Sequence, residues 1–180
     1  MKVNTLRSEY LSNHPYFKAR KDAYELASGK IVDPYFVVEM PPSATAMAIT
    51  AEGEVIMVTQ YRHPIGTEIL ELPGGFIEQD ESPIEGITRE LLEETGYQFN
   101  EIVYLGCTAA NPGLMNNFTH LFLATGGVKI QAQELDQNEE IKISLLPISA
   151  VKELLLSSEI KQSMHALCIF YALQKLNLLG

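Results

Sequence analysis

Three glutamates are crowded into one turn of sequence between Arg89 and Gly96. Glu90 and Glu94 stand four residues apart with Glu93 between them, so a helix would carry the three carboxylates on adjoining parts of one face. Like charges at this spacing destabilise a helix by about 0.2–0.5 kcal/mol per pair. Carboxylate oxygens suit hard divalent cations such as Mg²⁺ or Mn²⁺, which would remove that repulsion. The spacing therefore indicates a divalent-metal site, and a solvated acidic helix face is the alternative interpretation.

The segment that would carry these glutamates has the start and stop signals of a helix. Ser82–Glu85 combines an N-cap serine, a proline at the first helical position and a glutamate at the third, an arrangement that satisfies exposed N–H groups reciprocally. Gly96 is a natural stop. A short strand is predicted over 68–72 and ends at Pro73–Gly75, where two glycines let the backbone turn closely before the helix.

The rest of the chain is predicted to alternate short strands with two further helices. Extended runs are expected over 16–27, 31–40, 44–50, 55–60, 102–107, 118–124 and 141–145. Helices are expected from Pro147, with Ser149 as its cap, and over 163–176, where apolar residues recur at helical spacing. Strands and helices without regular βαβ alternation predict an α+β fold, a mixed β-sheet sandwiched between α-helices. Residues 1–42 are expected to form a small N-terminal β appendage, and residues 43–180 the main domain.

The residues around the glutamates follow a known spacing. Gly75 is followed after five residues by Glu81, and after seven more by Arg89–Tyr97, which matches every fixed position of the Nudix box. The chain therefore resembles the Nudix hydrolases, and the order of its predicted strands is also similar to that family. The resemblance implies the Nudix-type fold over 43–180 and metal-dependent hydrolysis of a diphosphate bridge.

The resemblance also implies a metal-binding role for part of this segment. The groups expected to hold Mg²⁺ or Mn²⁺ are the carbonyl of Gly74 and the carboxylates of Glu90, Glu93 and Glu94. Arg89 and Glu81 are expected to form an ion pair that fixes the loop to the helix. Three apolar side chains, Ile87, Leu91 and Leu92, are expected to face the core.

Catalytic roles are implied for Arg89 and Glu90 in the box and for an acidic residue beyond it. In ADP-ribose pyrophosphatase-like relatives the base that activates water comes from a later loop. The segment 135–143 resembles that loop, with Glu139 as the better match for the base and Glu140 as the alternative.

Further features favour ADP-ribose, or a related nucleoside diphosphate sugar, as the substrate. Segments 58–64 and 71–75 resemble ADP-ribose pyrophosphatases, which implies that Arg62 contacts a phosphate and that Glu71 also takes part in substrate binding. Pro112 resembles the proline-bearing loop of the same group. The N-terminal appendage is expected to cross to a second subunit of a homodimer and to help bind adenine there. Its candidate stacking side chains are Tyr16, Phe17, Tyr35 and Phe36.

Two alternative functions fit the same sequence. Another member of the superfamily would cleave a different nucleoside diphosphate derivative, such as GDP-mannose or a dinucleotide. A Nudix-like domain that binds ADP-ribose without cleaving it is the alternative from another functional class. Loss of a box glutamate or an attached DNA-binding domain would be typical of such a module, and the sequence has neither sign.

Charge and composition exclude several classes of protein. The chain has 23 Asp and Glu against 13 Lys and Arg, a net charge of −10, which argues against nucleic-acid binding and against a polybasic membrane surface. No signal peptide or membrane span is evident, so a cytoplasmic protein is expected. Cys107 and Cys168 are expected to be buried free thiols. Residues 75–97 alone hold seven acidic and one basic side chain, so the negative charge is concentrated at the proposed metal site.

Overall fold

The computed structural model describes residues 3–179 and divides them into two units. The smaller unit comprises the chain up to Pro41 together with Ala109–Phe118, and the larger unit begins at Pro42 and holds the remainder. No helix among the described residues is long and apolar enough to cross a membrane.

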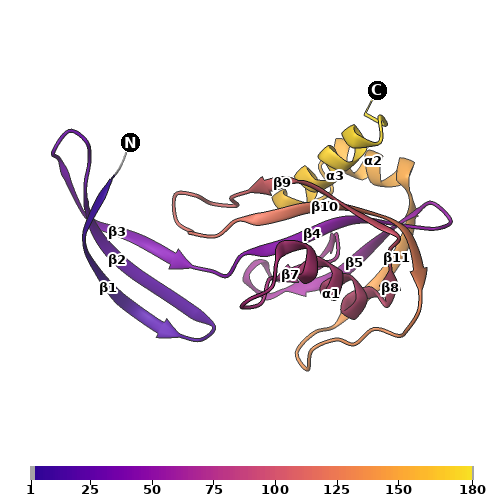
Figure 1. Cartoon of the computed structure of the whole chain (residues 1–180), viewed down its shortest axis with the longest axis horizontal. Coiled ribbons are helices and arrows are strands. Elements are labelled where there is room, and N and C mark those ends of the chain that lie inside the picture. The colour runs from indigo at the N-terminus through magenta and orange to yellow at the C-terminus, as the bar shows by residue number, and fades with distance from the viewer. Residues whose placement is uncertain (1–2, 180) are drawn as a thin grey trace. The chain divides into compact units, whose positions relative to one another are not determined.

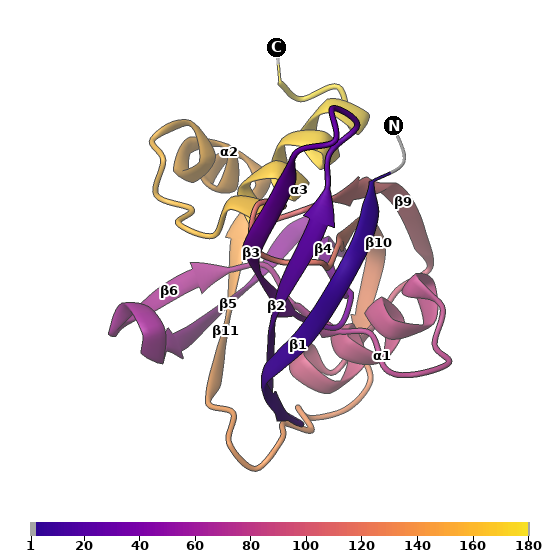
Figure 2. The same ribbon diagram turned by 90° about the vertical axis from the view of Figure 1, so that its left-hand side faces the viewer.

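The smaller unit is a three-stranded antiparallel sheet in the order β1-β2-β3 (Figure 2). Its strands are β1 (Asn4–His14), β2 (Phe17–Glu25) and β3 (Ile31–Glu39). The sequence predicted the two later strands and missed β1, because nearly all its side chains are exposed and no apolar alternation marks it. The segment Ala109–Phe118 completes the unit. Val38 of β3 donates its N–H to the carbonyl of Leu114 at 2.8 Å.

The larger unit is built on an eight-stranded mixed sheet. Its central path runs β11-β5-β4-β10-β8, with β6 beside β5, β7 beside β4 and β9 beside β10. The strands are β4 (Ser43–Thr50), β5 (Glu54–Arg62), β6 (Thr67–Glu71), β7 (Gly74–Phe76), β8 (Tyr97–Gln98), β9 (Glu101–Thr108), β10 (Thr119–Lys129) and β11 (Ile141–Pro147). Among the strand pairs described within this sheet, only β4–β10 is parallel.

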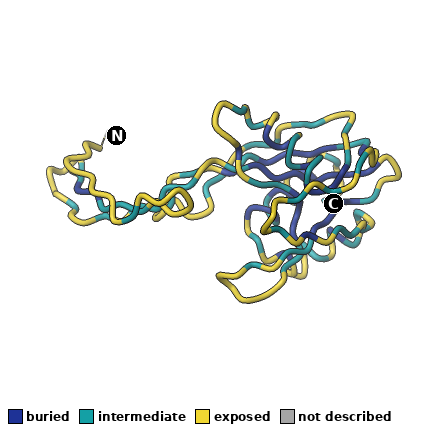
Figure 3. The backbone as a smooth tube through the Cα atoms, turned by 90° about the horizontal axis from the view of Figure 1, so that it is seen from below, coloured by how far each residue is buried: buried dark blue, intermediate teal, exposed yellow. Residues whose placement is uncertain are grey.

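Helices cover both faces of this sheet, which confirms the predicted α+β sandwich (Figure 1). Helix α1 (Pro83–Thr95) packs on one face, and helices α2 (Ile148–Leu156) and α3 (Ser163–Lys175) pack on the other. Successive residues of β4 alternate between the two cores, as the pleat of a strand requires. Ala46 packs in the α1 core, whereas Met47 packs in the core below α2 and α3. The buried positions accordingly follow the strands of the larger unit (Figure 3).

The ends of α1 are those that the sequence predicted. Ser82 and Glu85 form the reciprocal capping box, and Gly96 ends the helix in the left-handed conformation at φ 75° with its N–H bonded to the Leu92 carbonyl. Gly86 lies in the helix interior, where a Cβ would come within 3.2 Å of the Ile77 side chain. A residue that costs helix stability is therefore used here for close packing of the helix against the loop before it.

Three details of the sequence interpretation were wrong. Ser149 lies inside α2, whose N-cap is Pro147 and has no side-chain cap bond. Cys107 is exposed, and of the two thiols only Cys168 is buried. Leu92 is half-buried and lies outside the α1 core that contains Ile87 and Leu91.

Candidate active site

Strand β7 places two glycines against the carboxylates of α1. Gly74 has φ +145°, and a Cβ there would stand 2.2 Å from the carbonyl oxygen of Ala44 on the neighbouring strand. A Cβ on Gly75 would stand 2.6 Å from a carboxylate oxygen of Glu90. Gly74 therefore requires glycine, because its neighbour is backbone and its φ is positive, whereas a side chain at Gly75 would displace the Glu90 carboxylate. The backbone of β7 thus passes directly beside the acidic face of the helix.

Glu94 is the most deeply buried of the box glutamates, with 7% of the residue exposed. Its Oε2 accepts the Gly74 N–H at 2.8 Å, which fixes the carboxylate at the end of β7. Burial raises the pKa of Glu94 to about 8, against the opposing effect of the Gly74 hydrogen bond, and the charges of Glu90 and Glu139 raise it further. Burial likewise raises the pKa of Glu90, and the neighbouring Arg89 opposes that shift.

Arg89 ties the loop, the strand and the helix together. Its Nε donates to Glu81 at 2.8 Å, and one terminal nitrogen donates to the carbonyl of Phe76 at 2.9 Å. The other terminal nitrogen donates to Glu90 at 3.0 Å and to Glu93 at 2.9 Å. The predicted Arg89–Glu81 ion pair is therefore present, and the same guanidinium also holds two of the box carboxylates.

The loop before β11 brings a further carboxylate to the same place. Glu139 accepts the N–H of Asp136 at 3.3 Å and donates its own N–H to the Asp136 carbonyl at 3.0 Å, so a tight turn orients it. It lines the same cavity as Glu90 and Glu94, and its charge is among the causes that raise the pKa of both. Glu140 is exposed and does not line the cavity described below.

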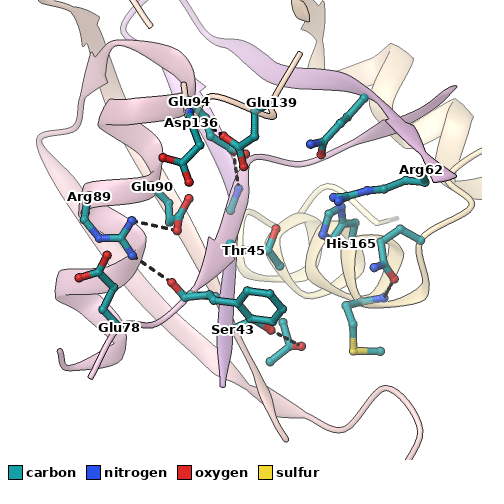
Figure 4. A pocket seen from close by; sticks show the side chains of 18 residues that line it. Ser43, Thr45, Arg62, Glu78, Arg89, Glu90, Glu94, Asp136, Glu139 and His165 are labelled. Carbon is teal, nitrogen blue, oxygen red and sulfur yellow. Dashed lines mark hydrogen bonds and ion pairs between the residues drawn. The ribbon is translucent and has the colours of Figure 1, made fainter. Parts of the chain in front are cut away.

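One cavity of about 550 Å³ in the larger unit is lined by the two glycines of β7 and by Arg89, Glu90, Glu94 and Glu139. Figure 4 shows Glu90, Glu94 and Glu139 on one side of it and Arg62 with His165 on the other. Other side chains at its wall include Ser43, Thr45, Gln60, Phe76, Glu78, Asp136, Gln162 and Met164.

The buried carboxylate of Glu71 holds the guanidinium of Arg62 in position. Both its Nε and one terminal nitrogen lie 2.9 Å from the same Oε2 of Glu71, a residue that is 1% exposed. Burial raises the pKa of Glu71, and the Arg62 charge and hydrogen bond oppose that rise. The pair positions the guanidinium at the cavity wall, and Glu71 lies behind it rather than at the wall itself.

The donor set on the acidic wall fits a divalent cation. Within residues 3–179 no three Asp, Glu, His or Cys side chains are arranged in this conformation to hold a metal ion. The chemistry of the wall is nevertheless that of a hard-cation site, because three carboxylates line it and the charge of Glu139 raises the pKa of both Glu90 and Glu94. Gly74 lines the same wall. Glu93 does not line it, and one of its carboxylate oxygens accepts a hydrogen bond from Arg89.

The remaining predicted substrate residues all lie in the smaller unit. Tyr16 and Phe17 stand at the β1–β2 turn, and Tyr16 is 92% exposed. Tyr35 donates its hydroxyl to the carbonyl of Gly113 at 2.7 Å, next to Pro112, and packs edge-on against Tyr24. Being adjacent on β3, Tyr35 and Phe36 point to opposite faces of the sheet, so the four aromatic side chains do not form one surface.

Sequence reasoning missed several residues at the cavity wall. Asp136 belongs to the acidic loop that the sequence singled out, so its acidic character was available as a signal. Gln60 likewise lies in the segment 58–64 that the sequence singled out, whereas Gln162 and His165 carried no signal, because nothing in their spacing relates α3 to β5 or to the glycines of β7.

Comparison with known proteins agrees with this geometry. Residues 40–167 match the family described as NUDIX domain, and residues 3–38 match the one described as Nucleoside diphosphate sugar hydrolase N-terminal domain. A solved structure described as an ADP compounds hydrolase superposes with a TM-score of 0.85 at 19% identity, covering 100% of this chain and 97% of that chain, and it shows the fold alone.

Three curated relatives have similar sequences over most of their length. The chain is 31% identical to the ADP-ribose pyrophosphatase of Bacillus subtilis, over 82% of this chain and 88% of that protein. It is 30% identical to the methanol dehydrogenase activator of Bacillus methanolicus, over 93% and 90%. It is 26% identical to the GDP-mannose pyrophosphatase of Yersinia enterocolitica, over 96% and 95%.

The buried Glu94 predicts a pH-dependent stability that divalent metal reverses. Since its pKa is raised to about 8 in the folded protein, its contribution to stability is complete below its ordinary pKa of 4.5 and is lost as the pH rises through 8. We expect the chelated protein to lose up to on the order of 3 kcal/mol of unfolding free energy across this window. Urea unfolding in EDTA at several pH values measures the loss.

Two controls belong to this prediction. Glu94→Gln, which carries no ionisable group, should lose distinctly less stability between pH 5 and 8 than the wild type. Mg²⁺ should restore the wild type at pH 8 and have little effect at pH 5. A chelated wild type whose unfolding free energy stays flat across the window would contradict the prediction.

Proposed function

This chain belongs to the Nudix family, and from that premise we propose that it hydrolyses the pyrophosphate bond of ADP-ribose or a related nucleoside diphosphate sugar. The products would be a nucleoside monophosphate and a sugar phosphate. One observation carries the substrate class: residues 3–38, ahead of the Nudix domain, match the N-terminal domain of nucleoside diphosphate sugar hydrolases. The ADP-ribose pyrophosphatase of Bacillus subtilis, similar over 82% of the chain, supports ADP-ribose as the first candidate.

The acidic wall would hold the metal on which this hydrolysis depends. Nudix hydrolases use divalent metal, and we propose Mg²⁺ here, held by Glu90, Glu94 and the Gly74 carbonyl, with Mn²⁺ as the alternative. Such a metal, when bound, neutralises phosphate oxygens and lowers the pKa of bound water. Glu93 was expected among the ligands. Like Glu90 it accepts a hydrogen bond from Arg89, but unlike Glu90 it does not line the cavity, so its carboxylate would have to turn toward the cavity to become a ligand.

Glu139 is proposed as the general base. It lines the same cavity as Glu90 and Glu94 and is oriented by the turn at Asp136, and this position supports a role in activating the attacking water. Arg89 would act by holding Glu90 in position, and Arg62, on the opposite wall, by binding a phosphoryl oxygen through its free terminal N–H groups.

A second candidate substrate is GDP-mannose. The observation that favours it is the similarity, over 96% of the chain, to the GDP-mannose pyrophosphatase of Yersinia enterocolitica. The diphosphate would be cleaved by the same chemistry, and the residues that recognise the nucleobase would differ.

A cytoplasmic location remains a prediction from the sequence.

A substrate panel tests the proposed activity. The full chain with Mg²⁺ is incubated with ADP-ribose, ADP-glucose, GDP-mannose and diadenosine diphosphate, and products are separated by ion-exchange chromatography. We expect AMP and ribose 5-phosphate from ADP-ribose as the fastest reaction, and no product in EDTA. Faster release of GMP from GDP-mannose would select the second candidate, and tight binding of ADP-ribose without turnover would instead support a binding module.

The assignment of the base predicts a kinetic difference between two adjacent glutamates. Glu139→Gln should lower kcat by roughly 10²–10⁴-fold with little change in KM, because a positioned base contributes about that much. Glu140→Gln is the matched control, since Glu140 is exposed outside the cavity, and its kcat should stay within a few-fold of wild type. The reverse order of the two effects would transfer the role of base to Glu140.

We also propose that the chain is a homodimer joined through the smaller unit. The exposed apolar side chains of its sheet include Leu6, Tyr10, Leu11, Tyr16, Phe17, Ile31 and Phe36. Phe36 lies opposite Lys21 in the β2–β3 register, and Phe17 stands an even number of residues from Lys21, so the two phenylalanines share one face. A sheet of three strands with such a face gains stability by covering it.

Sedimentation of the full chain at micromolar concentration tests the dimer. We expect the mass of two chains for the wild type and of one chain for the Phe17→Ser/Phe36→Ser variant, because the variant removes the apolar side chains of that face. Leu156→Ser is the control, since Leu156 is 70% exposed on the larger unit, and it should remain dimeric. A wild-type protein that sediments as a single chain would refute the proposal.

A further inference from the structure

His165 is a buried residue at the cavity wall that the proposed reaction does not yet use. It lies in the first turn of α3 and is 8% exposed, and it lines the same cavity as Arg62 and the box glutamates. Its Nδ1 accepts the backbone N–H of Leu72 at 3.1 Å. Leu72 follows Glu71, so this bond ties α3 to the segment that supports Arg62.

The Leu72 hydrogen bond fixes where the imidazole proton resides. An Nδ1 atom that accepts a hydrogen bond carries a lone pair and no proton. Burial, with a smaller contribution from the Arg62 charge, lowers the pKa of His165 to about 3, so the ring is neutral at physiological pH. A neutral imidazole with a bare Nδ1 carries its proton on Nε2. No residue within 3–179 accepts a hydrogen bond from that Nε2.

The surroundings of His165 favour a ligand that accepts hydrogen bonds and carries negative charge. The guanidinium of Arg62 lies beside the ring, across the cavity from the carboxylates (Figure 4). Its hydrogen bond from Nε and its ion-pair contact from one terminal nitrogen both go to the same oxygen of Glu71, which leaves the other terminal nitrogen available among the described contacts. Gln162, Met164 and His165 place the N-terminal end of the 13-residue helix α3 at the same wall, where the helix dipole also favours an anion.

We propose that His165 is a substrate-binding residue whose Nε2–H donates to a phosphoryl oxygen held jointly with Arg62. The identity of the ligand rests on the proposed function, which supplies a diphosphate between the two walls. Toward the cavity the Nε2–H of His165 and the guanidinium of Arg62 offer only donors, and an ionised phosphoryl oxygen only accepts, whereas a sugar hydroxyl also has a proton that needs an acceptor. The metal-binding wall would hold the diphosphate from one side, and this donor pair from the other.

Two substitutions separate the binding role of His165 from its bond to Leu72. In His165→Asn the side-chain oxygen takes the place of Nδ1 and keeps the Leu72 bond, but no donor reaches the position of Nε2. In His165→Gln the amide nitrogen reaches the position of Nε2, and the Leu72 bond is lost. The first variant therefore removes the proposed contact alone, and the second removes the structural bond alone.

The kinetic expectation follows from the charge of the acceptor. A hydrogen bond to an ionised group contributes enough that His165→Asn should raise KM for the cleaved nucleotide sugar about 10-fold or more, with kcat within a few-fold. His165→Gln should show the smaller rise in KM and the larger fall in unfolding midpoint. If His165→Gln has the larger rise in KM, or if neither variant changes KM, the residue is structural and the proposal is overturned.

A measurement without turnover tests the same contact if no nucleotide sugar is hydrolysed. Protein labelled with ¹⁵N-histidine is titrated with ribose 5-phosphate, inorganic pyrophosphate and ribose in Mg²⁺, and the ring nitrogens of His165 are followed by NMR. We expect an Nε2-protonated ring in the free protein and a shift of Nε2 with both phosphates but not with ribose. A shift with ribose of equal size, or no shift with any of the three, would overturn the proposal. A shift in a protein that cleaves nothing would refute the proposed function and leave this contact standing.

Discussion

The close approach of the β7 backbone to the carboxylates of α1 is the constraint on which the rest of the site depends. Gly75 leaves no room for a side chain beside Glu90, and the N–H of Gly74 is the group that fixes Glu94. Burial in this narrow space destabilises the ionised carboxylates, and Arg89 is the one cation of the segment 75–97 that offsets their charge. Backbone geometry, burial and charge are thus coupled, and a change in one would alter the other two.

The local parts of this arrangement could be predicted from sequence, because they depend on residues that are close along the chain. The capping box at Ser82, the stop at Gly96 and the Arg89–Glu81 pair follow from spacing within one loop and one helix. Strand β1 could not be predicted, since its side chains are exposed on both faces and show no alternation. The contact of His165 with Leu72 joins residues 93 positions apart, and no pattern in a single sequence relates them.

The two walls of the cavity differ in the kind of group that they offer. The acidic wall presents the carboxylates of Glu90 and Glu94, whose raised pKa values show how unfavourable their charges are without a cation. The opposite wall presents hydrogen-bond donors. Glu71 is buried behind Arg62 and bonded to it, so its carboxylate does not face the cavity. An anionic substrate can therefore bind to an acidic protein, because the donors of one wall and the cations bound to the other wall both interact favourably with its negative charge.

The smaller unit is assembled from two stretches of chain that lie far apart in sequence. Val38 pairs with Leu114, Tyr35 bonds to Gly113, and the N–H of Met40 bonds to the side chain of Asn116. During synthesis this sheet can therefore acquire its last edge contacts only after residues 109–118 have left the ribosome, when most strands of the larger unit have already been made. For the same reason, the first forty residues are not a module that recombination could transfer intact, because Tyr35 and Met40 bond to residues encoded 78 and 76 codons downstream of them.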